Sequence, residues 1–149
     1  MSLQTEVMTA MKTAMKAKDQ NALASLRAIK SAILTAQTES GASEELAEEE
    51  EIKILQKLVK QRKDSAAIYT EQDRTEMAEE ELAQAAVIEQ FLPEQMSPEE
   101  IEKIVLSIIE TTGASGMQDM GKVMGLASQE LAGKADGKTI STIVRQKLA

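Results

Sequence analysis

Apolar residues recur at helical spacing from one end of this chain to the other. In the first stretch, Leu3, Val7, Met11 and Ala14 lie three or four positions apart, so they share one face of a helix. Similar stripes follow in the later segments, and no segment sustains the alternation of apolar and polar residues that is typical of a half-buried strand. The pattern predicts an all-α protein.

Residues that begin and end helices divide the first part of the chain. Ser2 and Asp19 are of the type that caps a helix N-terminus, so they predict the starts of the first two helices, and Gly41 predicts the end of the second. The third and longest helix is expected from about residue 44 to Tyr69. Ser43 and the two glutamates after it would begin that helix, with the acids at the positive end of its dipole.

A boundary between two subdomains is expected at Leu92–Pro93. Before it, Asp73 and Glu76 have the spacing of a capping box, which predicts the start of a fourth helix that Pro93 ends. We therefore expect an N-terminal bundle of four longer helices over residues 1–92. A compact subdomain of three helices would follow over residues 93–149.

The C-terminal helices have clear boundary signals. Ser97, Pro98 and Glu100 supply a cap, a first-turn proline and a capping-box partner for the fifth helix, and Gly113 ends it. A sixth helix follows, and Asp136 is the expected cap of the seventh. Of the seven glycines, only Gly41 precedes the boundary at Leu92–Pro93. Glycines therefore lie within and between the short C-terminal helices.

Composition excludes several classes of function. Cysteine and histidine are absent, which removes thiol nucleophiles, Cys/His zinc sites and the usual general base near neutral pH. We therefore expect no catalytic residue, no metal and no cofactor. One Tyr, one Phe and no Trp make a base-stacking platform implausible. No apolar stretch is long enough to span a membrane, so a cytoplasmic protein without a membrane partner is expected.

Charge is unevenly distributed along the chain. The formal net charge of −8 argues against a whole surface that binds nucleic acid, and no DNA partner is expected. Two segments are nevertheless basic. Residues 53–63 hold five bases and no acid, and residues 111–149 hold five bases against three acids. A polyanionic partner should meet one of these two segments.

The segment 133–139 superficially resembles a phosphate-binding P-loop. It has three residues, not four, between its first glycine and the Gly-Lys-Thr, and no strand is predicted before it. A simpler site is a helix N-terminus flanked by Lys134 and Lys138, which suits a phosphate of RNA. The alternative is an ordinary helix cap with both lysines in solvent.

Two glycines in the sixth helix, Gly121 and Gly125, also need a reason. Each costs about 1 kcal/mol relative to alanine inside a helix. We expect close packing of a neighbouring helix at these positions, and close approach of a ligand is the alternative.

Five charged residues are predicted on the inner faces of the N-terminal helices, because each lies within the apolar arc of its helix or at the edge of that arc. They are Arg27, Lys30, Arg62, Glu81 and Glu89. Their signs match, so structural ion pairs across the bundle are expected. Catalysis by Glu81 or Glu89 is the alternative.

Four segments together resemble the YqeY-like (GatB/YqeY) family. They are 61–65 (QRKDS), 91–93 (FLP), 119–125 (DMGKVMG) and 133–138 (GKADGK), and the fourth helix between the first two is rich in acids. The family is similar to the tail domain of the B subunit of tRNA-dependent amidotransferases, an appendage that helps to hold tRNA. Its small helical members are bacterial or organellar.

The resemblance implies that the glycine-lysine motifs form a surface facing tRNA. Its residues would be Gly121, Lys122, Lys134, Gly137 and Lys138. We therefore expect a non-catalytic module that binds tRNA or a tRNA-handling protein. A label of glutamine-dependent carbon–nitrogen ligase would describe only an accessory role in translation. The alternative is a protein–protein interaction adapter that makes no RNA contact.

Overall fold

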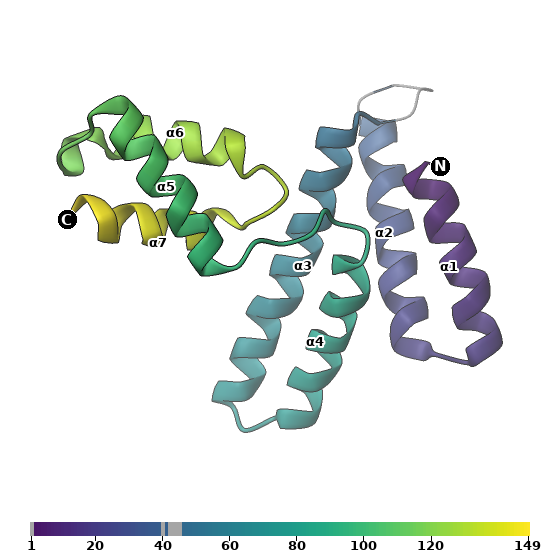
Figure 1. The fold of residues 1–149 in the computed structure, drawn as a ribbon. Helices are drawn as coiled ribbons and strands as arrows, with labels where there is room; N and C mark the ends of the chain where they lie inside the picture. Colours follow the sequence, from purple (N-terminus) through teal and green to yellow (C-terminus); the bar gives the residue numbers. More distant parts are fainter. Residues whose placement is uncertain (1, 40, 42–45) are drawn as a thin grey trace. The chain divides into compact units, whose positions relative to one another are not determined.

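The computed structural model describes residues 2–39, 41 and 46–149, and the regular structure of these residues is all helical, which confirms the predicted class (Figure 1). The chain divides into two compact units, Met1–Leu92 and Pro93–Ala149. The first contains α1 (Leu3–Ala17), α2 (Gln20–Glu39), α3 (Glu48–Glu71) and α4 (Thr75–Glu89). The second contains α5 (Pro98–Thr112), the short 3-10 turn η1 (Met117–Asp119), α6 (Met120–Glu130) and α7 (Gly137–Leu148).

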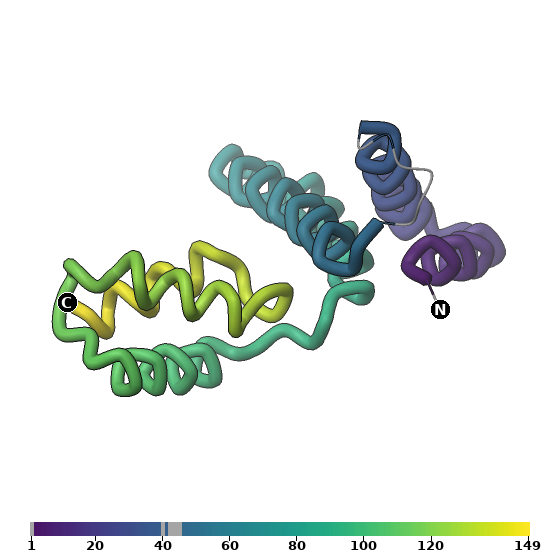
Figure 2. The backbone as a smooth tube through the Cα atoms, turned by 90° about the horizontal axis from the view of Figure 1, so that it is seen from above, coloured from purple at the N-terminus to yellow at the C-terminus, as the bar shows by residue number. Residues whose placement is uncertain are grey.

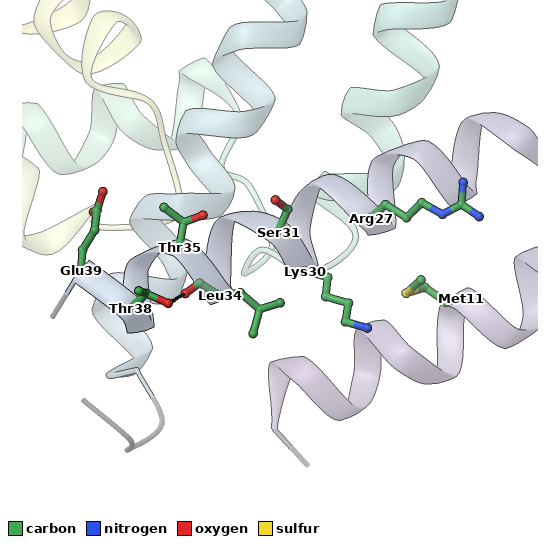
Figure 3. Close-up of a pocket in the computed structure, with 8 residues that line it drawn as sticks. All are labelled: Met11, Arg27, Lys30, Ser31, Leu34, Thr35, Thr38 and Glu39. Carbon is green, nitrogen blue, oxygen red and sulfur yellow. Dashed lines mark hydrogen bonds between the residues drawn. The ribbon is translucent and has the colours of Figure 1, made fainter. Parts of the chain in front are cut away.

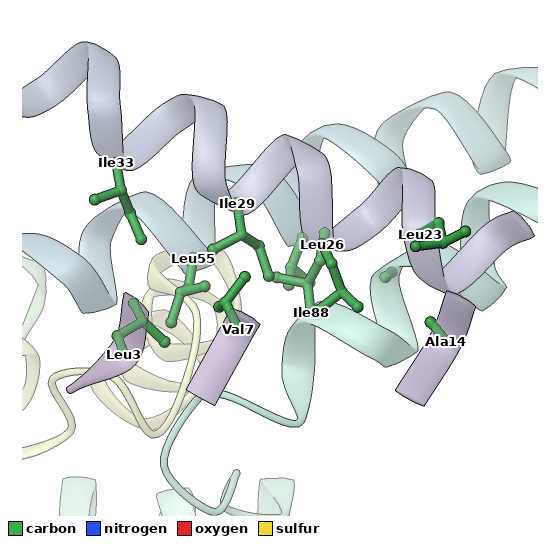
Figure 4. Close-up of a cluster of buried hydrophobic side chains, with 11 residues drawn as sticks. Leu3, Val7, Ala14, Leu23, Leu26, Ile29, Ile33, Leu55 and Ile88 are labelled. Carbon is green, nitrogen blue, oxygen red and sulfur yellow. The ribbon is translucent and has the colours of Figure 1, made fainter. Parts of the chain in front are cut away.

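In the N-terminal unit, α2 is the central helix, because it contacts α1, α3 and α4. The helices α3 and α4 pack closely against each other, as α1 does against α2. Leu26, Ile29 and Ile88 are almost completely buried where these helices meet, together with Val7 and Leu55 (Figure 4). Apolar positions at helical spacing therefore form the core, as the sequence pattern predicts.

Two predicted N-caps of this unit are confirmed. The Ser2 hydroxyl accepts a hydrogen bond from the backbone N–H of Thr5 at 3.3 Å, and the Asp19 carboxylate accepts one from Ala22 at 3.0 Å. Each satisfies one of the amide groups that a helix start leaves without an intrahelical acceptor. The cap residues thus fix where α1 and α2 begin.

Other boundaries of the N-terminal unit were predicted wrongly. The helix α3 begins at Glu48 and not near residue 44, because Leu46 and Ala47 are not helical. The predicted cap at Ser43 lies outside the described residues. The capping box of Asp73 and Glu76 does not form.

The start of α4 shows why that capping box is absent. Its N-cap is Arg74, whose side chain makes no capping hydrogen bond, and Asp73 has a left-handed backbone with φ of 59°. Asp73 is therefore part of the tight turn between α3 and α4. The helix α4 also ends at Glu89, ahead of Pro93, because residues 90–92 form a turn.

In the C-terminal unit, α5, α6 and α7 pack pairwise around a second apolar core (Figure 2). Its most deeply buried side chains include Val105, Val123, Leu131 and Val144. The predicted caps are confirmed at both ends of α5: Ser97 accepts a hydrogen bond from the N–H of Glu100, and Gly113 is the C-cap. Among the described residues, no helix has both the length and the apolar composition needed to cross a membrane.

Candidate functional site

The connection between α6 and α7 presents two of the predicted lysines. Its backbone turns at Gly133, which is buried and has a φ of 77°, a left-handed conformation that glycine adopts without steric cost. Leu131 and Ala135 anchor the connection in the core. Lys134, between these anchors, is exposed to solvent, as is Lys138 in the first turn of α7.

Hydrogen bonds from the segment that precedes α5 hold this connection in place. The Gln95 side-chain amide donates from Nε2 to the carbonyl oxygen of Gly133 at 2.7 Å and to that of Pro93 at 2.8 Å. The backbone N–H of Met96 donates to the carbonyl oxygen of Lys134 at 2.9 Å. Lys134 is therefore displayed from a backbone fixed on both sides.

The N-terminus of α7 confirms the predicted cap. Oδ1 of Asp136 accepts a hydrogen bond of 2.7 Å from the backbone N–H of Thr139. The N–H groups of Gly137 and Lys138 have no acceptor among the described residues, since the first amides of a helix have none within the helix. The positive end of the helix dipole and two lysines thus meet at this turn, with one carboxylate beside them.

The other predicted contact residues lie elsewhere. Gly121 and Lys122 belong to the first turn of α6, and α6 and α7 run in opposite directions (Figures 1 and 2). About 12 Å of helix separates Lys122 from the end of α6 at Glu130, at 1.5 Å of rise per residue. The five predicted residues therefore lie in two groups at opposite ends of the α6–α7 pair.

The structure does not support helix packing as the reason for Gly121 and Gly125. Both are exposed, and a Cβ atom added at either would meet no atom of the described residues within 4 Å. This expectation was wrong because the buried face of α6 is formed by Val123 and Ala127 instead. The glycines leave a strip of bare helix backbone facing solvent.

Several charges of the C-terminal unit already have partners. Lys147 pairs with Glu102 at 2.7 Å, and the Asp119 carboxylate accepts a hydrogen bond from the N–H of Ser115 at 3.0 Å. Within the described part of the chain, four exposed bases of residues 111–149 have no ion-pair partner. They are Lys122, Lys134, Lys138 and Arg145.

The charged residues predicted on the inner faces of the N-terminal unit differ in the contacts that they make. Glu89 pairs with Lys63 across α3 and α4 at 2.7 Å. Arg62 donates from its guanidinium to the carbonyl oxygen of Leu58 at 3.2 Å, and its buried Nε has no acceptor in the described residues. Glu81 is half-buried, and none of the ion pairs found in the described ranges includes it.

Arg27 and Lys30 lie outside the bundle interior. Both are exposed and line an open hollow of about 570 Å³ along α2, which Met11 of α1 also borders (Figure 3). This surface was not predicted from the sequence. The local charge of the sequence could have indicated this surface. Residues 2–39 hold five bases and three acids, a net charge of +2, whereas the net charge of the chain is −8.

Sequence comparison relates the chain to components of amidotransferases. A segment of 48 residues, 32% of this chain, is 48% identical to the E subunit of glutamyl-tRNA(Gln) amidotransferase from Thermococcus gammatolerans. The corresponding identity to the E subunit from Methanococcus maripaludis is 46% over 48 residues. The matched segment makes up only 8% of the length of either relative.

Fold and likeness together define an amidotransferase-related helical module. The chain belongs to the YqeY family of Yqey-like proteins. The family's sequence pattern matches residues 4–148. The membership expected from the glycine-lysine motifs is thus confirmed. The relatives named above are E subunits of an amidotransferase, in agreement with the expected similarity to an amidotransferase subunit.

Proposed function

We propose that this chain is a non-catalytic module that binds tRNA through its C-terminal unit. One observation carries the proposal: Lys134 and Lys138 are exposed, without ion-pair partners in the described residues, on either side of a helix start whose first amides lack acceptors. A phosphate group can accept hydrogen bonds from the N–H groups of Gly137 and Lys138 while both ammonium groups balance its charge.

The first turn of α6 supplies a second contact. Lys122 is exposed there, and the bare backbone at Gly121 lets a sugar–phosphate strand approach closely. Two contacts at opposite ends of a helix pair suit an extended polyanion better than a small ligand. Contacts of this kind bind the nucleic-acid backbone without selecting a sequence.

The names of the related proteins support this choice of partner. They are subunits of an enzyme that acts on glutamyl-tRNA(Gln). A small module appended to such an enzyme would bind either tRNA or the enzyme itself. In this proposal the module holds tRNA for a tRNA-handling protein and supplies no catalytic group. Any part in amidation is that of an accessory.

The proposal is tested with bulk deacylated tRNA and fluorescence anisotropy. The double variant Lys134→Glu/Lys138→Glu should lose most of the affinity of the unchanged protein. The matched control Lys53→Glu/Lys57→Glu places the same charge change on exposed positions of α3 and should keep it. Equal loss in both variants would contradict a specific site in the C-terminal unit, because either net charge alone matters or tRNA also meets the basic segment 53–63. An unchanged affinity in the first variant would place tRNA elsewhere or favour an adapter without RNA contact.

A further inference from the structure

The hollow along α2 has the features of a groove for a partner helix. It follows one side of α2 from Arg27 to Glu39, a length of about 18 Å at 1.5 Å per residue, and Met11 of α1 borders it (Figure 3). Leu34 lies within it and is 49% exposed. An elongated segment of about three helical turns fits this length.

Three methionines lie along α1, and the half-buried one, Met11, borders the hollow. Met8, Met11 and Met15 are three and four positions apart and therefore share one face of the helix. Met8 is 53% exposed and Met15 is 61% exposed, so neither is part of the N-terminal core. Flexible thioether side chains of this kind adapt to the apolar face of a bound helix.

Two cations give this surface its charge. Arg27 and Lys30 line the hollow together with one carboxylate, Glu39, which leaves a net charge of +1, and neither cation belongs to an ion pair within the residues that the structure describes. The hairpin of α1 and α2 has a net charge of +2, from five bases and three acids, in a chain whose net charge is −8. This local excess attracts and orients an acidic partner.

We propose that this hollow binds an acidic amphipathic helix of a partner protein, with its apolar face on Leu34 and the methionines and its carboxylates on Arg27 and Lys30. The two apolar residues of the lining, Met11 and Leu34, gain from contact with apolar side chains, which a phosphate backbone does not offer. Among the described residues that line the hollow, none has an aromatic side chain on which a base could stack. These residues belong to the N-terminal unit, so the inference does not depend on tRNA binding by the C-terminal unit.

The test uses a fluorescent synthetic peptide of about 15 residues, with leucines at helical spacing and glutamates on the flanks. A second peptide carries lysines in place of the glutamates, and a third has the first composition in scrambled order. Anisotropy is measured with the full chain. The glutamate peptide should bind, whereas the lysine and scrambled peptides should bind at least about tenfold more weakly.

Variants connect binding to the hollow. Arg27→Glu/Lys30→Glu and, separately, Leu34→Gln should each weaken binding of the glutamate peptide about tenfold or more, while Lys53→Glu/Lys57→Glu should not. Far-UV circular dichroism verifies that each variant is folded. Equal binding of the scrambled peptide, no effect of the hollow variants, or no saturation at about 1 mM protein would overturn the inference. Loss of tRNA affinity in Arg27→Glu/Lys30→Glu without loss of peptide affinity would also overturn it and assign the cations to RNA.

Discussion

Gln95 donates a hydrogen bond from Nε2 to the carbonyl oxygen of Gly133 at 2.7 Å, across 38 positions of the chain. This bond joins the segment before α5 to the connection between α6 and α7, beside the bond from Met96 to Lys134. The lysine that we place against tRNA is thus held by residues from the start of the C-terminal unit. Binding geometry and the stability of this unit are therefore linked.

Replacing Gln95 with Leu should destabilise the C-terminal unit by about 1 kcal/mol, because the carbonyl oxygen of buried Gly133 loses its donor. Urea unfolding monitored by circular dichroism measures the change. Gln146→Leu is the control, since Gln146 is exposed on α7 and makes no hydrogen bond through its side chain within the described ranges. A similar loss in both variants would contradict a specific role for Gln95.

Two substitutions at Asp136 separate capping from charge. Asp136→Ala removes the acceptor of the Thr139 N–H and should cost about 1 kcal/mol of stability. Asp136→Asn keeps a good cap and removes a negative charge that lies in sequence between Lys134 and Lys138. It should therefore preserve stability and raise tRNA affinity. Reduced tRNA affinity in a fully stable Asp136→Asn protein would contradict the proposed phosphate site.

Two glycine-to-alanine substitutions should have opposite effects. Gly113 has a φ of 68°, so Gly113→Ala should cost about 1–2 kcal/mol through backbone strain. Gly125 is inside α6 with open space around its Cβ position, so Gly125→Ala should stabilise the protein by about 1 kcal/mol. Thermal unfolding distinguishes the two signs. Destabilisation by Gly125→Ala would show that a neighbour does pack against α6 there.

The ion pair between Lys63 and Glu89 should contribute little to stability. Both side chains retain solvent contact, at 56% and 34% exposure, so salt and water screen the pair. A double-mutant cycle with Lys63→Met and Glu89→Gln should give a coupling free energy of about 0.2–1 kcal/mol that decreases with added salt. A coupling well above this range and insensitive to salt would mark a buried, desolvated pair.

Much of the fold follows from local chemistry that the sequence displays. Side-chain caps at Ser2, Asp19, Ser97 and Asp136 act over three or four residues, so their positions predict where α1, α2, α5 and α7 begin. The same logic misplaced the start of α4. There Asp73 has the composition of a cap but adopts the left-handed conformation that the turn after α3 requires.

The sites were less predictable, because they depend on how helices pack. A helical wheel placed Lys30 within the apolar arc of its helix, yet the core lies toward Leu26 and Ile29, which leaves Lys30 on the hollow. The opposite directions of α6 and α7 separate Lys122 from Lys138, and no motif spacing contains that information. The bond from Gln95 to Gly133 is equally invisible in the sequence.

The salt dependence of tRNA affinity tests the central claim most directly. Contacts of Lys122, Lys134 and Lys138 with phosphates should give a log–log slope of about −2 to −3, since each contact releases close to one counterion. Lys134→Glu/Lys138→Glu should make the slope shallower by about 2, and Lys53→Glu/Lys57→Glu should leave it unchanged. Binding with the same slope in all three proteins, or no binding at low salt, would contradict tRNA recognition by the C-terminal unit.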